Sequence, residues 1–191
     1  APAPGLVSYF PGVRFLYVGS AKIRQKLFFK QEIEQLMAAI FNDDFRDFIQ
    51  ALNNNNVEYI LVGGYAVILH GYRRATGDMD IWVNRTKENY SKLTGAFLQF
   101  GLPVFDMTEE KFLNADTADV FSYGRPPVSI DIITNLKGVE FNDAFSQSQQ
   151  FDENGLFIRF IHLNNLIQSK KAAGRHKDLD DIEKLTPGDG Y

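Results

Sequence analysis

Three aspartates have the type and spacing to do chemistry together. Asp78 and Asp80 lie two residues apart in the stretch DMDIWV, and Asp131 lies in a second apolar stretch, VSIDII. Residues two apart in a strand share a face and lie about 6.5–7 Å apart, so Met79 and Ile81 point to the opposite, core side. If the two strands are neighbours, three carboxylates converge and repel one another unless a cation lies among them. Mg²⁺, or Mn²⁺ in its place, suits carboxylate and phosphate oxygens, and two such ions stabilise phosphoryl transfer.

A pair of glycines precedes these acids. Gly63 and Gly64 end the β-branched run VEYILV and open a short apolar segment. Bare backbone N–H groups at such a turn can hold phosphate, although most glycine pairs are merely turns, and most isolated D-x-D pairs lie on a solvated sheet face. Arg73, Arg74 and Thr76 follow the turn. They are either phosphate-binding donors or solvated loop residues.

Strand-like and helix-like segments alternate through the centre of the chain, which predicts a sheet covered by helices, a mixed α+β fold. The spacing predicts strands over 57–62, 78–83, 120–123, 128–133 and 155–162. It predicts helices over 33–41, 45–52, 65–70, 86–100, 108–113, 139–145, 163–173 and 176–185. The single tryptophan, Trp82, is expected in the core.

The composition excludes several classes of protein. With 45% apolar and 23% charged residues over 191 positions, the chain has the balance of a folded protein of about one domain. It contains no cysteine, which excludes disulfides, Cys-ligated zinc and thiol catalysis. Its net charge of -4 disfavours binding of nucleic acid by bulk positive charge. Since no apolar run approaches the roughly 18 residues of a membrane span, we expect a soluble, cytoplasmic protein without a membrane partner.

The two ends of the chain carry local basic clusters. Residues 1–40 form an expected N-terminal extension, distinct from a single domain over 41–191. The extension either packs on the domain or touches a polyanion through its cations: Arg14, Lys22, Arg24, Lys26 and Lys30. Near the C-terminus a second cluster lies directly before three aspartates, and composition alone favours a salt-bridged surface helix. Its members are Lys170, Lys171, Arg175, His176 and Lys177.

The order of these motifs resembles the nucleotidyltransferase superfamily that includes DNA polymerase beta. The motifs are Val62-Gly63-Gly64, then Asp78-Met79-Asp80, then Asp131. The sequences of three segments resemble those of small bacterial nucleotidyltransferase-like proteins related to the AbiEii-type toxins of type IV toxin–antitoxin systems. These segments are VGGYAVILHGYRRATGDMDIWV, PPVSIDIITNLKGVEFNDA and LIQSKKAAGRHKDLDDIEKL. The resemblance covers about residues 41–185, and the first forty residues match nothing in the family.

The resemblance implies a nucleotidyltransferase fold, a central mixed sheet flanked by helices with further helices at the C-terminus. It implies Mg²⁺ on Asp78, Asp80 and Asp131, and a nucleoside triphosphate whose phosphates lie along Gly63 and Gly64. The third acid, Asp131, is both a metal ligand and a candidate base. The remaining nucleotide contacts expected are Arg74, Thr76, Lys170 and Lys177, with Asp178 orienting one of the lysines and Tyr65 stacking on a base.

Two functions of different kinds follow from these expectations. The first is a Mg²⁺-dependent nucleotidyltransferase that acts on RNA, a protein or a small molecule as acceptor, with a role as the toxin of a toxin–antitoxin pair. The second is a non-catalytic module that retains the fold and binds a nucleotide or a partner, because fold alone does not guarantee activity. The partners expected are an antitoxin or a helical subunit from another gene.

Overall fold

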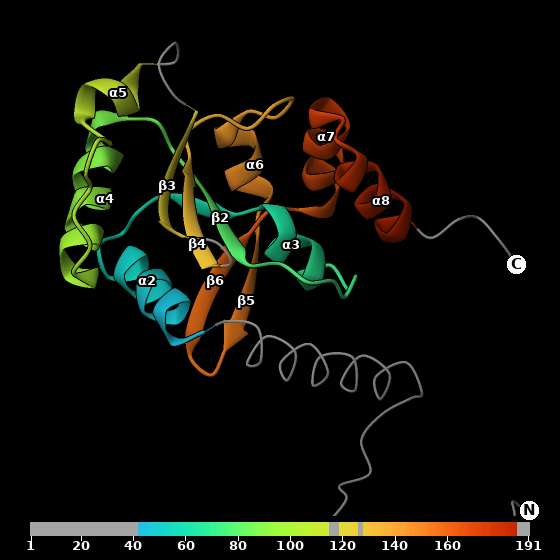
Figure 1. Ribbon diagram of the computed structural model, residues 1–191, viewed down its shortest axis with the longest axis horizontal. Coiled ribbons are helices and arrows are strands. Elements are labelled where there is room, and N and C mark those ends of the chain that lie inside the picture. The colour runs from blue at the N-terminus through green and yellow to red at the C-terminus, as the bar shows by residue number, and fades with distance from the viewer. Residues whose placement is uncertain (1–41, 115–118, 126–127, 187–191) are drawn as a thin grey trace, which may run out of the picture. The chain divides into compact units, whose positions relative to one another are not determined.

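The computed structural model describes residues 42–114, 119–125 and 128–186 (Figure 1). These residues belong to one compact unit, Ile33–Tyr191. The expected extension of residues 1–40 and the helix expected over 33–41 lie outside the described residues.

Six strands of the described chain form one mixed sheet in the order β3-β4-β2-β1-β6-β5. Strand β2 runs parallel to β4 and antiparallel to β1, and β1 runs parallel to β6. The outer pairs, β3 with β4 and β5 with β6, are antiparallel. The mixed α+β class expected from the sequence is confirmed. The strands are β1 (Tyr59–Leu61), β2 (Asp78–Val83), β3 (Val120–Arg125), β4 (Val128–Ile133), β5 (Gln149–Glu153) and β6 (Leu156–Phe160).

Helices cover both faces of this sheet, and the alternation of side chains along β2 explains why. Met79 and Ile81 are buried in a core on one face, while Trp82 belongs to a second core on the other face, where its ring meets Phe141 at 5.1 Å. Figure 1 shows α2, α4 and α5 on one side of the sheet and α6, α7 and α8 on the other. The helices are α2 (Asp43–Asn54), α3 (Gly63–Leu69), α4 (Lys87–Phe100), α5 (Glu109–Leu113), α6 (Phe141–Gln147), α7 (Leu163–Ala173) and α8 (His176–Leu185).

Local capping signals fix the ends of several helices. The Asn42 side chain accepts a hydrogen bond from the Phe45 N–H at 2.8 Å, and the Thr86 hydroxyl accepts one from the Asn89 N–H at 3.1 Å. Gly101 ends α4 with a φ of 82°, a left-handed conformation that glycine adopts without strain. The predicted helices over 45–52 and 86–100 are confirmed with these caps.

One strand was not predicted, and the bounds of several other elements differ from the prediction by one or two residues. Strand β5 was not predicted, because its sequence QQFDE is polar and lacks the apolar alternation of a buried strand; it lies at the edge of the sheet and forms by pairing with β6. Helix α6 begins at Phe141 rather than at residue 139. No helix within 42–114, 119–125 or 128–186 has both the length and the apolarity to cross a membrane.

Candidate functional site

The sheet brings two of the three aspartates to adjoining positions. Strands β2 and β4 are parallel neighbours, and their register pairs Asp80 directly with Asp131. Neighbouring strands lie about 4.7–4.9 Å apart, so the two carboxylates leave the same face side by side. Asp78 pairs with Ser129 at the more exposed start of β2, and the Ser129 hydroxyl donates a hydrogen bond to its carboxylate at 2.9 Å. Asp80 and Asp131 therefore form the centre of the acidic group.

Ionisation of both carboxylates of this acid pair is unfavourable. Burial is the main cause that raises the pKa of Asp80 to about 6, and the negative charge of Asp131 raises it further. A hydrogen bond donated by the Gly64 backbone N–H acts in the opposite direction. One oxygen of Asp131, Oδ1, is buried without a hydrogen-bond partner in the described chain. A cation between these two neighbouring anions would reduce their repulsion and contact the unsatisfied buried oxygen.

Glycine is required at both positions of the turn because side chains approach the backbone closely there. A Cβ atom at Gly63 would lie 1.8 Å from Oδ2 of Asp80, and the φ of Gly63 is +59°. A Cβ atom at Gly64 would lie 2.3 Å from Oγ1 of Thr76 and 3.0 Å from Nη2 of Arg74. Glycine at both positions lets these three side chains reach the backbone of the turn. The structure thus places Gly63 against Asp80, and Gly64 against Arg74 and Thr76.

A cavity of about 320 Å³ opens beside the turn, between the sheet and α7. Asp80 is the member of the acidic group that lines it, together with Gly63. Two cationic residues that the sequence did not single out for the site, Lys137 and Arg175, also line the cavity. The positive charge of Arg175 favours the ionised form of Asp80 and so opposes the rise of its pKa. The cavity therefore combines the Asp80 carboxylate with cations suited to phosphate oxygens.

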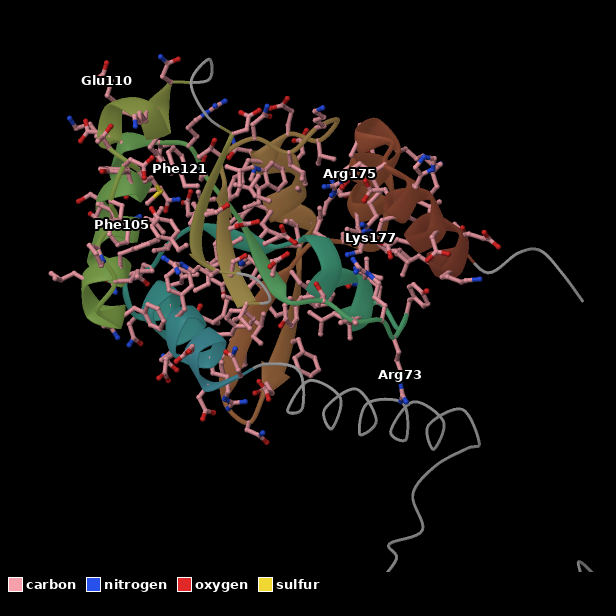
Figure 2. All side chains as sticks on the ribbon, in the orientation of Figure 1. Arg73, Phe105, Glu110, Phe121, Arg175 and Lys177 are labelled. Atoms are coloured by element: carbon pink, nitrogen blue, oxygen red, sulfur yellow. The ribbon has the colours of Figure 1, made fainter. Side chains whose placement is uncertain are left out.

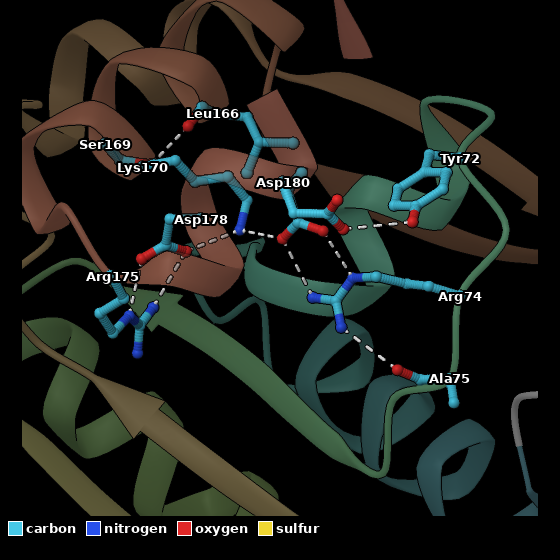
Figure 3. Close-up of polar contacts among 10 residues, drawn as sticks. Tyr72, Arg74, Ala75, Leu166, Ser169, Lys170, Arg175, Asp178 and Asp180 are labelled. Atoms are coloured by element: carbon cyan, nitrogen blue, oxygen red, sulfur yellow. Dashed lines mark hydrogen bonds and ion pairs between the residues drawn. The ribbon is translucent and has the colours of Figure 1, made fainter. Parts of the chain in front are cut away.

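A set of ion pairs adjoins this cavity (Figure 3), and its residues are largely buried except for the exposed Arg175. The Lys170 ammonium lies 3.0 Å from Oδ1 of Asp178 and 2.7 Å from Oδ2 of Asp181. Asp181 also pairs with Nε of Arg74 at 2.9 Å, and Asp178 with Nε of Arg175 at 2.7 Å. We call these five residues the C-terminal ion-pair cluster. It joins the loop before β2 to helices α7 and α8.

This cluster changes the part that two predicted nucleotide contacts can play. Lys170 lines the cavity but is only 5% exposed, and its ammonium is held by Asp178, the orienting acid that the sequence indicated, and by Asp181. Arg74 is likewise held by Asp181. Both residues position the site in this structure, and their contact with a triphosphate stays a prediction.

The other predicted contacts lie apart from the cavity lining. Lys177 is exposed on α8. Figure 2 shows Arg73 at the tip of the loop before β2, where its side chain points away from the sheet. Tyr65 is 2% exposed and packs edge-on against Phe45, with ring centroids 5.7 Å apart, so it offers no exposed ring face to a base. Tyr65 is a core residue here, because α3 turns this side of the helix toward α2.

Signals for the two missed cations are present but weak in the sequence. Arg175 belongs to the basic cluster before Asp178, yet helix periodicity does not show that it, rather than Lys177, faces the acids. It stands at the start of α8, directly after the left-handed Gly174 that separates α7 from α8. Lys137 follows β4 by a few residues, in a loop whose path only the tertiary structure defines.

The acid pair fits a divalent metal that takes its remaining ligands from elsewhere. Among the residues the structure describes, no three His, Cys, Asp or Glu side chains are gathered closely enough to hold a metal ion by themselves. Mg²⁺ is commonly held by one or two carboxylates plus water and substrate phosphates. Asp80 and Asp131, with the unpartnered Oδ1 of the latter, match that pattern. The predicted third ligand, Asp78, stays a prediction.

Comparison with known proteins identifies the family of the chain. A family model described as a nucleotidyltransferase of unknown function (DUF6036) matches residues 43–186. The chain belongs to this family. None of the curated proteins matches the sequence.

A solved structure shows the same kind of fold at low sequence identity. A crystal structure from Thermotoga maritima, whose description as a nucleotidyltransferase is provisional, has a TM-score of 0.50 and 15% identity, and the match covers 73% of this chain and 88% of that one. An antigenic nucleotidyltransferase-like protein from Paracoccidioides brasiliensis has a TM-score of 0.43 and 15% identity over 82% of this chain and 74% of its own. The expected fold and the nucleotidyltransferase family are confirmed, and the link to AbiEii-type toxins stays a prediction.

Proposed function

We propose that this member of the DUF6036 family is a Mg²⁺-dependent nucleotidyltransferase, which moves a nucleotide from a nucleoside triphosphate to an acceptor hydroxyl. The observation that carries the proposal is the pairing of Asp80 with Asp131 on adjacent parallel strands, beside the Gly63–Gly64 turn, with one buried carboxylate oxygen left without a partner. Family membership supports the general activity.

In this proposal Asp80 and Asp131 hold the metal, and Mn²⁺ is an alternative occupant. When bound, the metal supplies positive charge that stabilises the phosphate oxygens as the transfer proceeds. The acceptor oxygen forms a bond to the α-phosphorus, the bond from that phosphorus to the bridging oxygen breaks, and pyrophosphate leaves. Asp131 accepts the hydroxyl proton or serves only as a ligand, as the sequence left open.

The cations that line the cavity are assigned to the phosphate groups of the substrate. Lys137 and Arg175 lie where they can balance the charge of the triphosphate and of the departing pyrophosphate. Asp178 contacts Nε of Arg175 at 2.7 Å. This contact holds the guanidinium of a side chain that is 77% exposed. The exposed Lys177 is available to the phosphates only if the substrate extends beyond the cavity.

The first test is ligand-induced stabilisation. The thermal midpoint is measured with each of the four nucleoside triphosphates, with and without Mg²⁺, for the wild type and for Asp80→Asn, each variant being compared with its own ligand-free form. A ligand at about 100 times its Kd adds about 2.7 kcal/mol, which is roughly 5–10 °C for a chain of this size. We expect a Mg²⁺-dependent rise with at least one nucleotide, absent from Asp80→Asn.

Asp180→Asn is the matched control, since Asp180 is an exposed acid on α8 whose carboxylate accepts a hydrogen bond from Tyr72 at 3.3 Å. It should keep the nucleotide-dependent rise. An equal rise in Asp80→Asn would remove the acid pair from the proposal. Binding without any transfer of label from an α-phosphate-labelled nucleotide to RNA, protein or small molecules would favour the non-catalytic module.

The biological role proposed is that of a toxin whose acceptor is RNA or protein and whose activity an antitoxin or a helical partner controls. If so, expression of the wild type slows growth, Asp80→Asn and Asp131→Asn do not, and Asp180→Asn does. Growth arrest by all four chains would separate toxicity from nucleotide transfer.

A further inference from the structure

We propose that a second pocket, beneath the start of α6, is a binding site for a small oxyanion, a phosphate or carboxylate group. This pocket has a volume of about 200 Å³ and is distinct from the cavity at the glycine turn. We call it the α6 pocket; its lining includes Trp82, Arg85, Asn135, Glu140 and Phe141. The proposal goes beyond nucleotide transfer and does not depend on it.

Two buried donors in the α6 pocket have no acceptor. Trp82 is 2% exposed, and its indole Nε1 has no hydrogen-bond partner in the described chain. Nη1 of Arg85, which follows β2 by two residues, is also buried and without a partner among the described residues. Buried N–H donors are almost always paired, because an unpaired donor loses its bonds to water and gains nothing in return. An anion bound in the pocket would supply acceptor atoms for these donors.

The two donors define the chemistry of that ligand. An indole nitrogen donates only, and a guanidinium presents a planar set of donors that matches the oxygens of carboxylate or phosphate. The pocket is smaller than the 300–1,000 Å³ typical of sites for whole organic ligands. A small oxyanion, or the charged end of a larger molecule, fits both the donors and the volume.

The surroundings hold this pocket in shape. The Trp82 ring meets Phe141 of α6 nearly perpendicularly, with centroids 5.1 Å apart and planes at 80°. The end of β4 is fixed by a hydrogen bond from the Thr134 N–H to the Asp119 carbonyl at 2.9 Å. Asn135 lines both this pocket and the main cavity, so the two are neighbours. Among the described lining residues Glu140 is the one acid, and it is exposed.

Trp82 makes the site directly observable, because it is the single tryptophan of the chain. Its fluorescence is titrated with inorganic phosphate, and in parallel with acetate, in the presence of EDTA and without nucleotide. We expect a saturable change in the millimolar range or tighter with at least one anion, and the stronger of the two identifies a phosphoryl or a carboxylate ligand.

Two substitutions with opposite effects test the charge of the ligand. Arg85→Gln should weaken anion binding at least tenfold, because it removes the cation. Glu140→Gln should strengthen binding several-fold, because it removes an exposed negative charge from the pocket; as a surface change it leaves the fold intact and keeps the test valid if Arg85→Gln is unstable. Circular dichroism establishes that each variant is folded.

Arg175→Gln distinguishes this pocket from the main cavity. Binding at the α6 pocket should be unchanged in that variant. Loss of the signal in Arg175→Gln with retention in Arg85→Gln would place the anion in the main cavity and overturn the proposal. Weaker binding in Glu140→Gln, or no saturable change with either anion, would overturn it as well. Because metal and nucleotide are absent, none of these outcomes depends on the proposed transferase activity.

Discussion

Asp80 and Asp181 are both acids withdrawn from water, but their neighbours differ in charge. Asp181 is fully buried between two cations, with Lys170 at 2.7 Å and Arg74 at 2.9 Å. Asp80 has another carboxylate, Asp131, as its closest charged neighbour across the sheet. The first acid is compensated by two cations within the protein. The second is compensated only in part, by the Gly64 N–H and the charge of Arg175, and burial together with the Asp131 charge raises the pKa of Asp80 to about 6.

This difference suggests different roles for the two groups of charges, a structural role for the C-terminal ion-pair cluster and a functional role for the acid pair. A buried acid that is paired with cations holds elements together, and losing one member leaves an uncompensated charge. An acid pair that raises its own pKa is unfavourable for folding and is typical of a site that acquires its compensation from a ligand. We therefore propose that the C-terminal ion-pair cluster supports the candidate site and that the acid pair forms it.

The largest effect is expected from breaking the compensated region. Asp181→Asn leaves Lys170 and Arg74 short of a negative charge in the interior, and should lower the free energy of unfolding by about 3–5 kcal/mol. For a chain of this size that is a fall of roughly 10 °C in the thermal midpoint. Asp180→Asn, at the exposed neighbouring position, should change stability by less than about 0.5 kcal/mol. Equal, small effects of both substitutions would show that the cluster contributes little.

The next effect comes from the glycine turn that contacts the partly compensated region. Gly63→Ala introduces strain at a φ of +59° and places a Cβ 1.8 Å from the Asp80 carboxylate. We expect a loss of about 2–4 kcal/mol in stability together with loss of Mg²⁺-dependent nucleotide binding. Gly155→Ala is the control, because Gly155 also has a positive φ, +89°, but no atom lies within 4 Å of its Cβ position. It should cost about 1 kcal/mol and leave binding unchanged.

Removal of a charge from the acid pair should have the opposite sign. The pKa of Asp80 in the native protein is about 6, against 3.8 for an ordinary aspartate, so the native state holds the proton more tightly than the unfolded chain. Ionisation of Asp80 above pH 6 therefore lowers stability, and this loss disappears as the pH falls toward 4. Asp80→Asn should raise the free energy of unfolding by about 1–3 kcal/mol at pH 7.5 and by little at pH 4.

Urea unfolding at the two pH values measures this difference. Asp181→Asn, measured beside it, should be destabilised at pH 7.5. Destabilisation by both substitutions at that pH would mean that Asp80 is compensated by a group other than a ligand, and the contrast between the two regions would fail.

The sequence predicted the parts of the fold and site that local patterns encode. The limits of β2, Asp78–Val83, follow from the alternation at its start and the apolar residues at its end, and the start of α4 follows from the Thr86 cap. The pairing of Asp80 with Asp131 required only that their two strands be neighbours, which the alternation of helices and strands made a reasonable expectation. Strand β5 carries no such local pattern, since its structure comes from pairing with β6.

Contacts between distant parts of the chain were beyond the same reasoning. Arg74 and Asp181 are 107 residues apart in sequence, and nothing in either segment indicates that they meet. Lys170 was expected as a phosphate contact because the family resemblance implied it, whereas its burial between two acids follows from how α7 and α8 pack. For the same reason the sequence did not distinguish Arg175, which lines the cavity, from Lys177, which does not.

The smallest effect is a shift in titration that tests the acid pair itself. The Asp131 charge is the second cause, after burial, of the raised pKa of Asp80. Asp131→Asn should therefore lower the pKa of Asp80 below 6 without restoring 3.8, because burial remains. The carboxyl carbon of Asp80 can be followed by NMR against pH, with Asp180→Asn as the control that leaves the pKa unchanged. An unchanged pKa in Asp131→Asn would mean that the two carboxylates do not sense each other, and a cation shared between them would lose its electrostatic basis.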